Sequence, residues 1–159
     1  MVALFDRYRD PLLRYLSSFG VGFPDGEDII QDAFLSLFRH LKLEKSRDNL
    51  PGWLFRVVHN MAVKRRDRIR RDLDGRAEVD TEDCAIAPDP SPEDDLVSHQ
   101  TRQRMMAVVR ALREQDRRCL YLRAEGLRYR DIAEVLNMSL GAVSLSLARS
   151  LARIARSTE

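Results

Sequence analysis

The densest group of charged side chains in the sequence is basic. Of the eight residues from 64 to 71, six are Lys or Arg, and Asp67 is the only acidic residue among them. The dipole of a helix end accounts for two or three cations, so the others need a further partner. Side chains of this kind at this density bind phosphate groups, and the segment therefore predicts contact with a nucleic acid. The six cations are Lys64, Arg65, Arg66, Arg68, Arg70 and Arg71.

Aromatic and amide side chains come directly before these cations, at Trp53, Phe55, His59 and Asn60. Such groups beside a basic segment suit single-stranded or unstacked bases, which stack on aromatic rings and bond to amides. For Trp53 a position in the core is the favoured interpretation, because large aromatic side chains usually fill cores.

Two carboxylates, Asp28 and Asp32, stand four residues apart with Gln31 beside them. On one helix face, like charges at this spacing cost ~0.2–0.5 kcal/mol, so the pair is not explained by helix stability. Two interpretations remain, a solvated polar face and a docking surface for a basic protein partner.

Residues 129–151 have the spacing of a helix-turn-helix. Small Ala133 stands where a second helix must cross closely, and residues 137–139 predict a tight turn in which Ser139 caps the next helix. The helix expected over residues 140–155 would then be a recognition helix in a DNA major groove. A plain helical hairpin with the same apolar spacing is the alternative.

Catalytic and metal-binding motifs are missing from the sequence. There is no Gly-rich phosphate loop, no Gly-x-Ser-x-Gly and no His-Glu-x-x-His. His40, His59 and His99 do not combine with Cys84 or Cys119 at metal-ligand spacing. We therefore expect no enzymatic activity, no cofactor and no metal. Of the two cysteines, Cys119 is expected to pack as a small apolar residue and Cys84 is a candidate reactive thiol.

The elements that position these residues are expected to be helices. Apolar residues recur at steps of three and four, and no segment alternates with period two, which predicts an all-α fold. One helix is expected to begin at Asp25 and another near Pro51, whereas Pro11 either kinks the first helix or starts a new one at Asp10. The stripe expected to face the core from the second helix is Ile29, Ile30, Ala33, Phe34, Leu37, Phe38 and Leu41.

The net charge of +2 is the sum of three unlike blocks. Residues 1–71 carry +5, residues 72–97 carry −9 and residues 98–159 carry +6. Three prolines alternate over residues 88–92, which predicts a flexible acidic linker between two small helical domains. No apolar stretch approaches the ~20 residues that cross a bilayer, so we expect no membrane insertion. The low cysteine content and the lack of a leader favour the cytoplasm.

Three motifs in this order resemble an extracytoplasmic-function sigma factor, the minimal bacterial type with domains 2 and 4 only. They are DGEDIIQDAFLSLF at 25–38, WLFRVVHN at 53–60 and LRAEGLRYRDIAEVLNMS at 122–139. The resemblance implies domain 2 over residues 1–71 and a helix-turn-helix domain 4 over residues 98–159.

The resemblance also implies partners and roles. The partners are bacterial core RNA polymerase, promoter DNA and an anti-sigma factor, and the function is recognition of −10 and −35 promoter elements at transcription initiation. The segment 44–52 would be the loop beside the −10 element. The resemblance assigns core-polymerase binding to Asp28, Gln31, Asp32 and Phe34. It assigns contact with −10 DNA to Asn60, Lys64, Arg65 and Arg68. It assigns contact with −35 DNA to Tyr129, Arg130, Ser139, Ala142, Ser144 and Arg149.

The expected recognition helix departs from the family pattern. Ala142 replaces a threonine, and Ser144 and Ser146 replace two cations. At ~1–3 kcal/mol per contact, these losses weaken −35 binding about a hundredfold. This favours a second hypothesis, a sigma-like decoy that occupies an anti-sigma factor without productive DNA reading. A helix-turn-helix repressor is a third option, but it leaves residues 25–71 unexplained.

Overall fold

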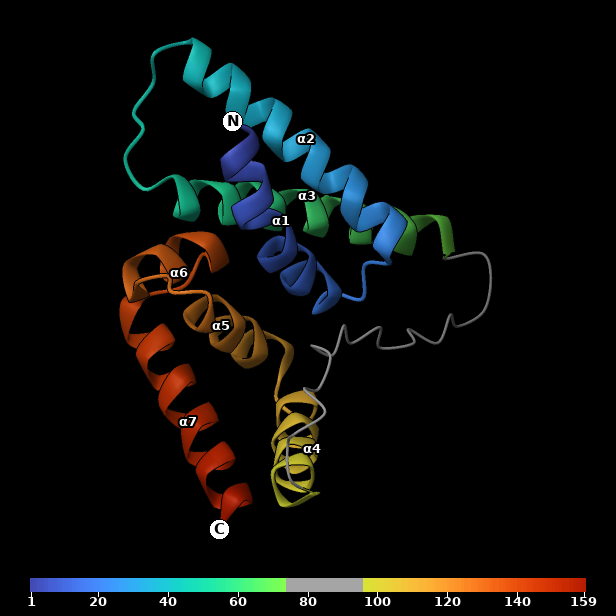
Figure 1. The fold of residues 1–159 in the computed structure, drawn as a ribbon, viewed down its shortest axis with the longest axis vertical. Helices are drawn as coiled ribbons and strands as arrows, with labels where there is room; N and C mark the ends of the chain where they lie inside the picture. The colour runs from blue at the N-terminus through green and yellow to red at the C-terminus, as the bar shows by residue number, and fades with distance from the viewer. Residues whose placement is uncertain (74–95) are drawn as a thin grey trace. The chain divides into compact units, whose positions relative to one another are not determined.

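The computed structural model describes residues 1–73 and 96–159, and these residues form seven helices and no strand. The all-α fold expected from the apolar spacing is confirmed. The helices fall into two units, one built from α1–α3 and the other from α4–α7 (Figure 1). Cys84 and nearly all of the expected acidic linker lie outside the described residues.

The first unit is a three-helix bundle of α1 (Val2–Ser17), α2 (Phe23–Lys42) and α3 (Leu50–Leu73). Each helix packs against the other two, and α2 and α3 run in opposite directions (Figure 1). Apolar side chains at helical spacing on all three helices meet in one core. Its fully buried members include Leu12, Leu16, Ile30, Ala33, Leu37, Leu54, Val58 and Ala62.

Two local expectations for this unit are wrong, and one of the two alternatives for Pro11 is excluded. The second helix begins at Phe23, with Pro24 in its first turn, so Asp25 lies inside the helix and does not cap it. Pro11 lies inside a single helix, α1, and no new helix starts at Asp10. Phe38 is 46% exposed because α2 turns it out of the apolar stripe, and Lys42 lies over its ring at 5.2 Å.

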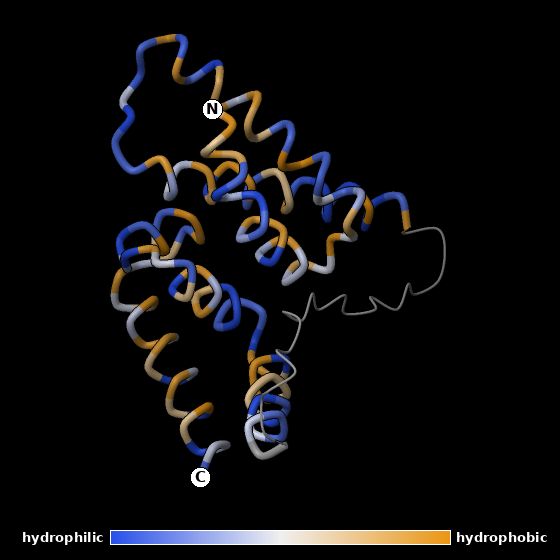
Figure 2. The backbone as a smooth tube through the Cα atoms, viewed as in Figure 1, coloured by the Kyte–Doolittle hydropathy of each residue, from blue (hydrophilic) through white to orange (hydrophobic). Residues whose placement is uncertain are grey.

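The second unit contains α4 (Leu96–Arg110), α5 (Glu114–Ala124), α6 (Tyr129–Leu136) and α7 (Leu140–Thr158). The last helix, α7, packs against the other three. Figure 2 shows that α7 is apolar or weakly polar along most of its length, with strongly polar residues only at intervals. The core of this unit includes Cys119, Leu122, Ile132, Val143 and Leu147.

The helix-turn-helix expected from the sequence is present in α6 and α7. Asn137 adopts the left-handed conformation (φ 53°), and the N–H of Met138 returns to the carbonyl of Ala133 at 2.9 Å. The expected cap is also confirmed, since the Ser139 hydroxyl accepts from the N–H of Ala142 at 3.1 Å. Among the described residues no single helix has the length and apolar character to cross a membrane. Only α6 and α7 taken together do, across a bend of 104°.

Cys119 is fully buried and packs as an apolar residue, as expected, with its Sγ 3.7 Å from Met138 Sδ. Burial raises the pKa of its thiol, the carboxylate of Asp116 acts in the same direction, and a hydrogen bond with Ser146 opposes both. Because the thiolate is the reacting form, we predict that iodoacetamide labels Cys119 at least ~100-fold more slowly in the folded chain than in urea at pH 8. Peptide mass spectrometry measures both rates, and similar rates in the two conditions would contradict this packing.

Candidate protein and nucleic-acid interfaces

Asp28, Gln31 and Asp32 lie together on the exposed side of α2, as expected from their spacing. Leu35 continues this side by one turn and is 56% exposed. We call these four residues the acidic face. Phe34 is not part of it, because only 7% of Phe34 is exposed and its ring packs edge-on against Phe5 at 5.0 Å. The assignment of Phe34 to core-polymerase contact is therefore corrected, and Phe34 is a core residue.

The opposite side of α2 determines which way the acidic face points. Ile30, Ala33 and Leu37 are fully buried against α1 and α3. Gly26 lets α1 approach closely, since a Cβ there would lie 3.2 Å from Leu13 Cδ2. Leu35 was missed in the sequence, although one signal was available, namely an apolar residue seven positions after Asp28 and hence on the polar side of the helix.

The basic track, residues 64–71, forms the last turns of α3. Asn60, Lys64 and Arg68 are exposed at steps of four residues, so they share one side of the helix. Arg65 instead forms an ion pair with Asp25 of α2. Of the four residues assigned to −10 DNA, three therefore lie on one exposed side of α3, and Arg65 is engaged within the unit.

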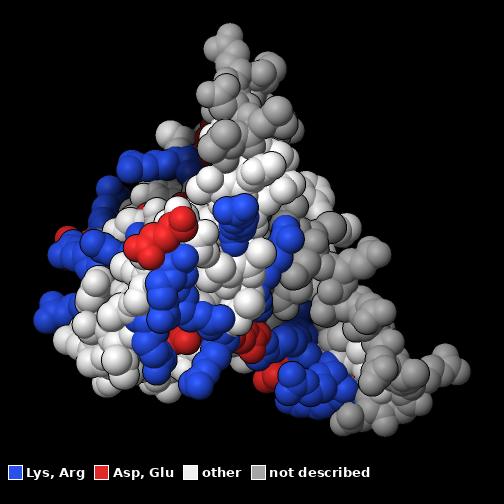
Figure 3. Space-filling view, turned by 90° about the horizontal axis from the view of Figure 1, so that it is seen from below, with Lys and Arg blue, Asp and Glu red and all other residues white. Residues whose placement is uncertain are grey.

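Figure 3 shows that Lys and Arg predominate over Asp and Glu on the face in view. Within the basic track, the Arg66 guanidinium lies over the Phe19 ring at 5.8 Å. Arg70 and Arg71 are exposed. The track thus divides into cations held against the bundle and cations directed into solvent, and only the second group is placed to meet phosphate.

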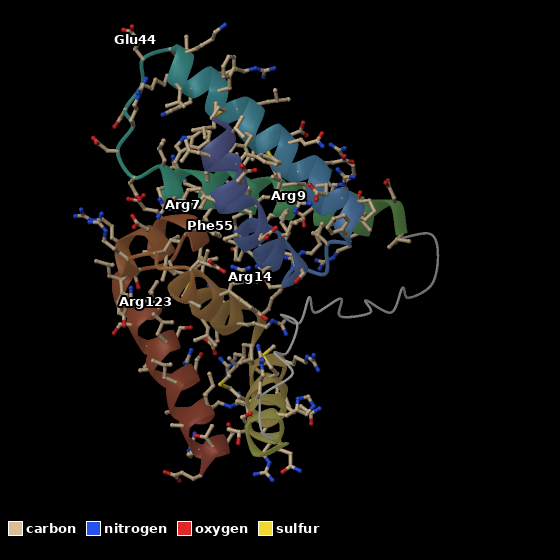
Figure 4. All side chains as sticks on the ribbon, viewed as in Figure 1. Arg7, Arg9, Arg14, Glu44, Phe55 and Arg123 are labelled. Atoms are coloured by element: carbon tan, nitrogen blue, oxygen red, sulfur yellow. The ribbon has the colours of Figure 1, made fainter. Side chains whose placement is uncertain are left out.

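Phe55 and His59 do not offer stacking surface, which corrects the interpretation of the segment before the basic track. Phe55 is 1% exposed and lies where α3 passes α1 (Figure 4), with its ring 5.8 Å from that of Tyr15. His59 is 9% exposed, and its Nδ1 shares a hydrogen bond of 2.8 Å with the Tyr15 hydroxyl. Trp53 is half-buried beside His40, at 4.9 Å between ring centroids, so it is neither a full core residue nor a free platform.

The segment between α2 and α3 is held at both ends. Glu44 (φ 52°) and Asn49 (φ 54°) both adopt the left-handed conformation. Figure 4 shows Glu44 at the end of the segment that follows α2. His40 Nε2 hydrogen-bonds the Ser46 carbonyl at 3.0 Å, and the N–H of Gly52 donates to Asn49 Oδ1 at 3.4 Å. The backbone of this segment is therefore a defined loop anchored to both helices.

The residues assigned to −35 DNA occupy α6, the turn and α7. Arg130 and Ser144 are exposed, and Tyr129 is 39% exposed with the Arg123 guanidinium 5.4 Å from its ring centre. The Ser139 hydroxyl is used in capping α7, and Ala142 is half-buried. Five of the six residues are exposed, and of these Tyr129, Arg130 and Ser144 are neither the cap of α7 nor paired with Asp116.

Asp116 of α5 is a buried carboxyl residue that holds α7, and no sequence pattern indicated this role. It is 8% exposed, and Asp116 Oδ1 accepts from the Ser146 hydroxyl at 2.6 Å and from Arg149 Nη2 at 3.1 Å. Ser146 is 1% exposed, so it faces the core and is not a lost DNA contact, which corrects that expectation. The charge of Arg149 is paired within the unit.

Within residues 1–73 and 96–159, no three His, Cys, Asp or Glu side chains are grouped as a metal site requires. The unit of α1–α3 instead carries an acidic face on α2 and a basic track on α3, and the unit of α4–α7 contains a helix-turn-helix. These features define a helical nucleic-acid-binding protein of two units.

Comparison with known proteins identifies the family. Residues 4–72 match sigma-70 region 2 and residues 102–154 match sigma-70 region 4. The chain is 30% identical over 155 residues to the RNA polymerase sigma factor NccH of Alcaligenes xylosoxydans xylosoxydans, covering 95% of this chain and 82% of NccH. It is 25% identical over 158 residues to the ECF RNA polymerase sigma factor BldN of Streptomyces coelicolor, covering 96% of this chain but only 58% of BldN.

A solved structure has the same fold. The sigma factor RpoE of Bartonella quintana, solved in complex with the anti-sigma factor NepR, superposes with a TM-score of 0.66 at 20% identity, over 98% of this chain and 94% of that one. The chain belongs to the sigma-70 family of RNA polymerase sigma factors, in its extracytoplasmic-function group.

Proposed function

We propose that the chain is the promoter-recognition subunit of a bacterial RNA polymerase holoenzyme, with no catalytic step of its own, acting in the cytoplasm. In this proposal residues 1–71 bind core polymerase and the −10 element, residues 98–159 bind the −35 element, and residues 72–97 connect them. The observation that carries the proposal is the pairing, on one three-helix bundle, of an exposed acidic face on α2 with exposed cations on α3.

The two surfaces of the bundle suit two different partners. The acidic face, with exposed Asp28, Gln31 and Asp32, is complementary to a basic protein surface on core polymerase. Asn60, Lys64 and Arg68 form an amide-and-cation row on α3. Extracting a base from a duplex costs a few kcal/mol, so a protein that holds a melted strand needs both backbone charge and a group that contacts the base. We assign the cations to phosphates and Asn60 to the base.

For the −35 element we assign the exposed side chains of the helix-turn-helix, with α7 in the major groove. Tyr129 and Arg130 lie at the start of α6, where they can contact the backbone. Ser139 and Ala142 have the lesser role of setting the start of α7, because the Ser139 hydroxyl already accepts the Ala142 N–H. Ser144 faces outward, and Arg149 is placed by Asp116.

We also propose an anti-sigma factor as a partner. RpoE of Bartonella quintana was solved with NepR, and CnrH, which superposes with a TM-score of 0.58 at 22% identity, was solved with the cytosolic domain of CnrY. A second candidate function, the decoy that only occupies such a factor, is favoured by one observation. The first nine residues of α7 contain no charged side chain, so this half of the helix supplies none of the cations on which electrostatic affinity for DNA depends.

Reconstituted transcription distinguishes the two functions. The full chain is mixed with bacterial core RNA polymerase and a library of bacterial promoter fragments, and run-off transcripts are sequenced. The proposed function predicts transcripts that start at a defined distance from shared −10 and −35 sequences and that require the chain. The lack of both core binding and such transcripts would support the decoy, which needs only an anti-sigma factor. Stable binding to core without any such transcripts would contradict the roles assigned in promoter recognition.

The exposed cations of the basic track should contribute measurable phosphate contacts. We predict that Lys64→Ala with Arg68→Ala weakens promoter binding by the holoenzyme about tenfold. The double variant should also reduce the slope of log affinity against log salt by about 1.4–1.8, since each lost phosphate contact removes ~0.7 for a single strand or ~0.9 for a duplex. Filter binding from 50 to 300 mM KCl measures both quantities.

The matched control for this prediction is Arg102→Ala with Arg104→Ala, which removes two exposed cations from α4. It makes the same change in net charge away from the basic track, so the affinity and the slope should change much less. An equal loss in the two double variants would mean that overall charge, and not contact by the basic track, determines the binding.

A further inference from the structure

The N-terminal half of α7 lacks the side chains that usually read DNA sequence. Residues 140–148 include no Arg, Lys, Asn, Gln, Asp or Glu, and this stretch of α7 is mostly apolar in Figure 2. In a helix-turn-helix the N-terminal residues of the second helix are the ones that contact base edges. If this domain reads a promoter element, it must do so with other chemistry.

Few side chains in this stretch are exposed and long enough to reach a base. Leu140 and Leu145 are 55% and 58% exposed, and Ser144 is the one exposed hydroxyl after the cap. The other hydroxyl, Ser146, is buried on Asp116 at 2.6 Å. Arg149 is the first cation of α7, and it too is bonded to Asp116. The exposed surface of this stretch therefore offers two leucines and a single hydroxyl, and of the two leucines Leu145 is the one next to Ser144.

The major groove offers hydrogen-bond donors and acceptors on every base pair, but only one apolar group, the C5-methyl of thymine. A serine hydroxyl donates and accepts, so it discriminates poorly between bases. An exposed leucine gains free energy only by removing apolar area from water. We propose that α7 recognises the −35 element by packing Leu145 against thymine methyl groups in the major groove. This proposal rests on the proposed function of the chain as a promoter-recognition subunit.

The chain offers a matched leucine for comparison. Leu151 is 55% exposed on the same helix, but it lies beyond Arg149, in the half of α7 that leads away from the groove. Leu145→Ala and Leu151→Ala remove the same atoms from positions of equal exposure. Neither contributes to the core of the unit, so both variants should fold like the parent chain.

The test replaces thymine by deoxyuridine, which pairs identically and lacks only the C5-methyl group. Holoenzyme reconstituted from bacterial core RNA polymerase and the full chain first selects promoters from a library randomised over the −35 region. Duplexes are then made with deoxyuridine at each selected thymine, one position at a time, and affinities are measured at fixed salt. We expect a thymine at one or two fixed positions and a loss of about fourfold for each methyl group that contacts Leu145.

The leucine variants then assign the effect. Leu145→Ala should bind the thymine and deoxyuridine duplexes equally, whereas Leu151→Ala should keep the fourfold difference. Selected −35 sequences without a fixed thymine, or deoxyuridine duplexes bound as tightly as the parent, would overturn the proposal while leaving the promoter function intact. Loss of anti-sigma binding alone in Leu145→Ala would also overturn it and assign this leucine to a protein partner. If the holoenzyme selects no promoter at all, the proposed function itself is contradicted, and this inference with it.

Discussion

Reversing both carboxylates of the acidic face, with Asp28→Arg and Asp32→Arg together, should lower the affinity of the chain for bacterial core RNA polymerase about a hundredfold. Both side chains are exposed on one side of α2, so the substitution changes the surface and not the core. Placing two cations against a basic partner costs several kcal/mol through like-charge repulsion, and ~2.8 kcal/mol corresponds to a factor of one hundred. Fluorescence anisotropy of the labelled chain against core polymerase measures the loss, which should shrink as salt is raised.

The control for this prediction uses the same geometry elsewhere in the same unit. Asp6 and Asp10 of α1 are also exposed and four residues apart. The double variant Asp6→Arg with Asp10→Arg therefore makes the same change in net charge, again at two positions one helical turn apart. We expect this control to bind core polymerase within about threefold of the parent chain. Unchanged binding by the acidic-face variant would remove α2 as the docking surface, and equal losses in both variants would show that only net charge matters.

Asp116→Ala should destabilise the second unit by about 3 kcal/mol. Asp116 is the buried acceptor for Ser146 and Arg149, and its removal leaves the buried Ser146 hydroxyl without this partner, which costs ~1–3 kcal/mol. The loss of the ion pair between Asp116 and the half-exposed Arg149 adds at most ~1 kcal/mol to the destabilisation, because solvent screens that pair. Hydrogen exchange of α5 and α7 amides in the full chain measures this unit separately from the first one.

A double-mutant cycle identifies the cause of that loss. Asp116→Ala with Ser146→Ala removes both partners of the buried hydrogen bond, so it should be ~1–2 kcal/mol less destabilising than the sum of the single variants. Glu134→Ala is the control, because Glu134 is an exposed carboxylate on α6, and it should change stability by less than ~0.5 kcal/mol. If the free-energy changes of the two single variants simply added up in the double variant, the Asp116 and Ser146 side chains would not stabilise one another.

The parts of the structure that follow from local sequence were predicted, and those that depend on distant partners were not. Ser139 caps α7 because a cap needs only residues three positions away. The exposure of Asp28 and Asp32 follows from helical periodicity. By contrast, Asp116 meets Ser146 thirty residues later, and no pattern in the sequence relates the two.

For Phe34 two sequence patterns made different predictions. Its position in a family motif assigned it to the docking surface, whereas the apolar spacing placed it in the core, and burial of its ring against Phe5 decides for the core. Arg65 was assigned to −10 DNA from the family resemblance and the basic segment around it, but its ion pair with Asp25 links residues forty positions apart. Residue type therefore predicted the kind of surface, and tertiary pairing determined which members of a charged segment are available to it.

The loop between α2 and α3 has a consequence for engineering. At the C-terminal end of the loop, Asn49 and Gly52 approach closely. A Cβ on Gly52 would lie 2.5 Å from Asn49 Nδ2, and Asn49 has a left-handed backbone at φ 54°. A side chain at position 52 therefore requires the Asn49 side chain to move away from the start of α3. Residues 45–48, between Glu44 and Asn49, include Ser46, whose carbonyl is bonded to His40 Nε2 and whose hydroxyl donates to Asp48 Oδ2. An exchange of this loop with that of another sigma factor should therefore keep the Asn49–Gly52 junction and the loop length, so that the carbonyl at position 46 still meets His40.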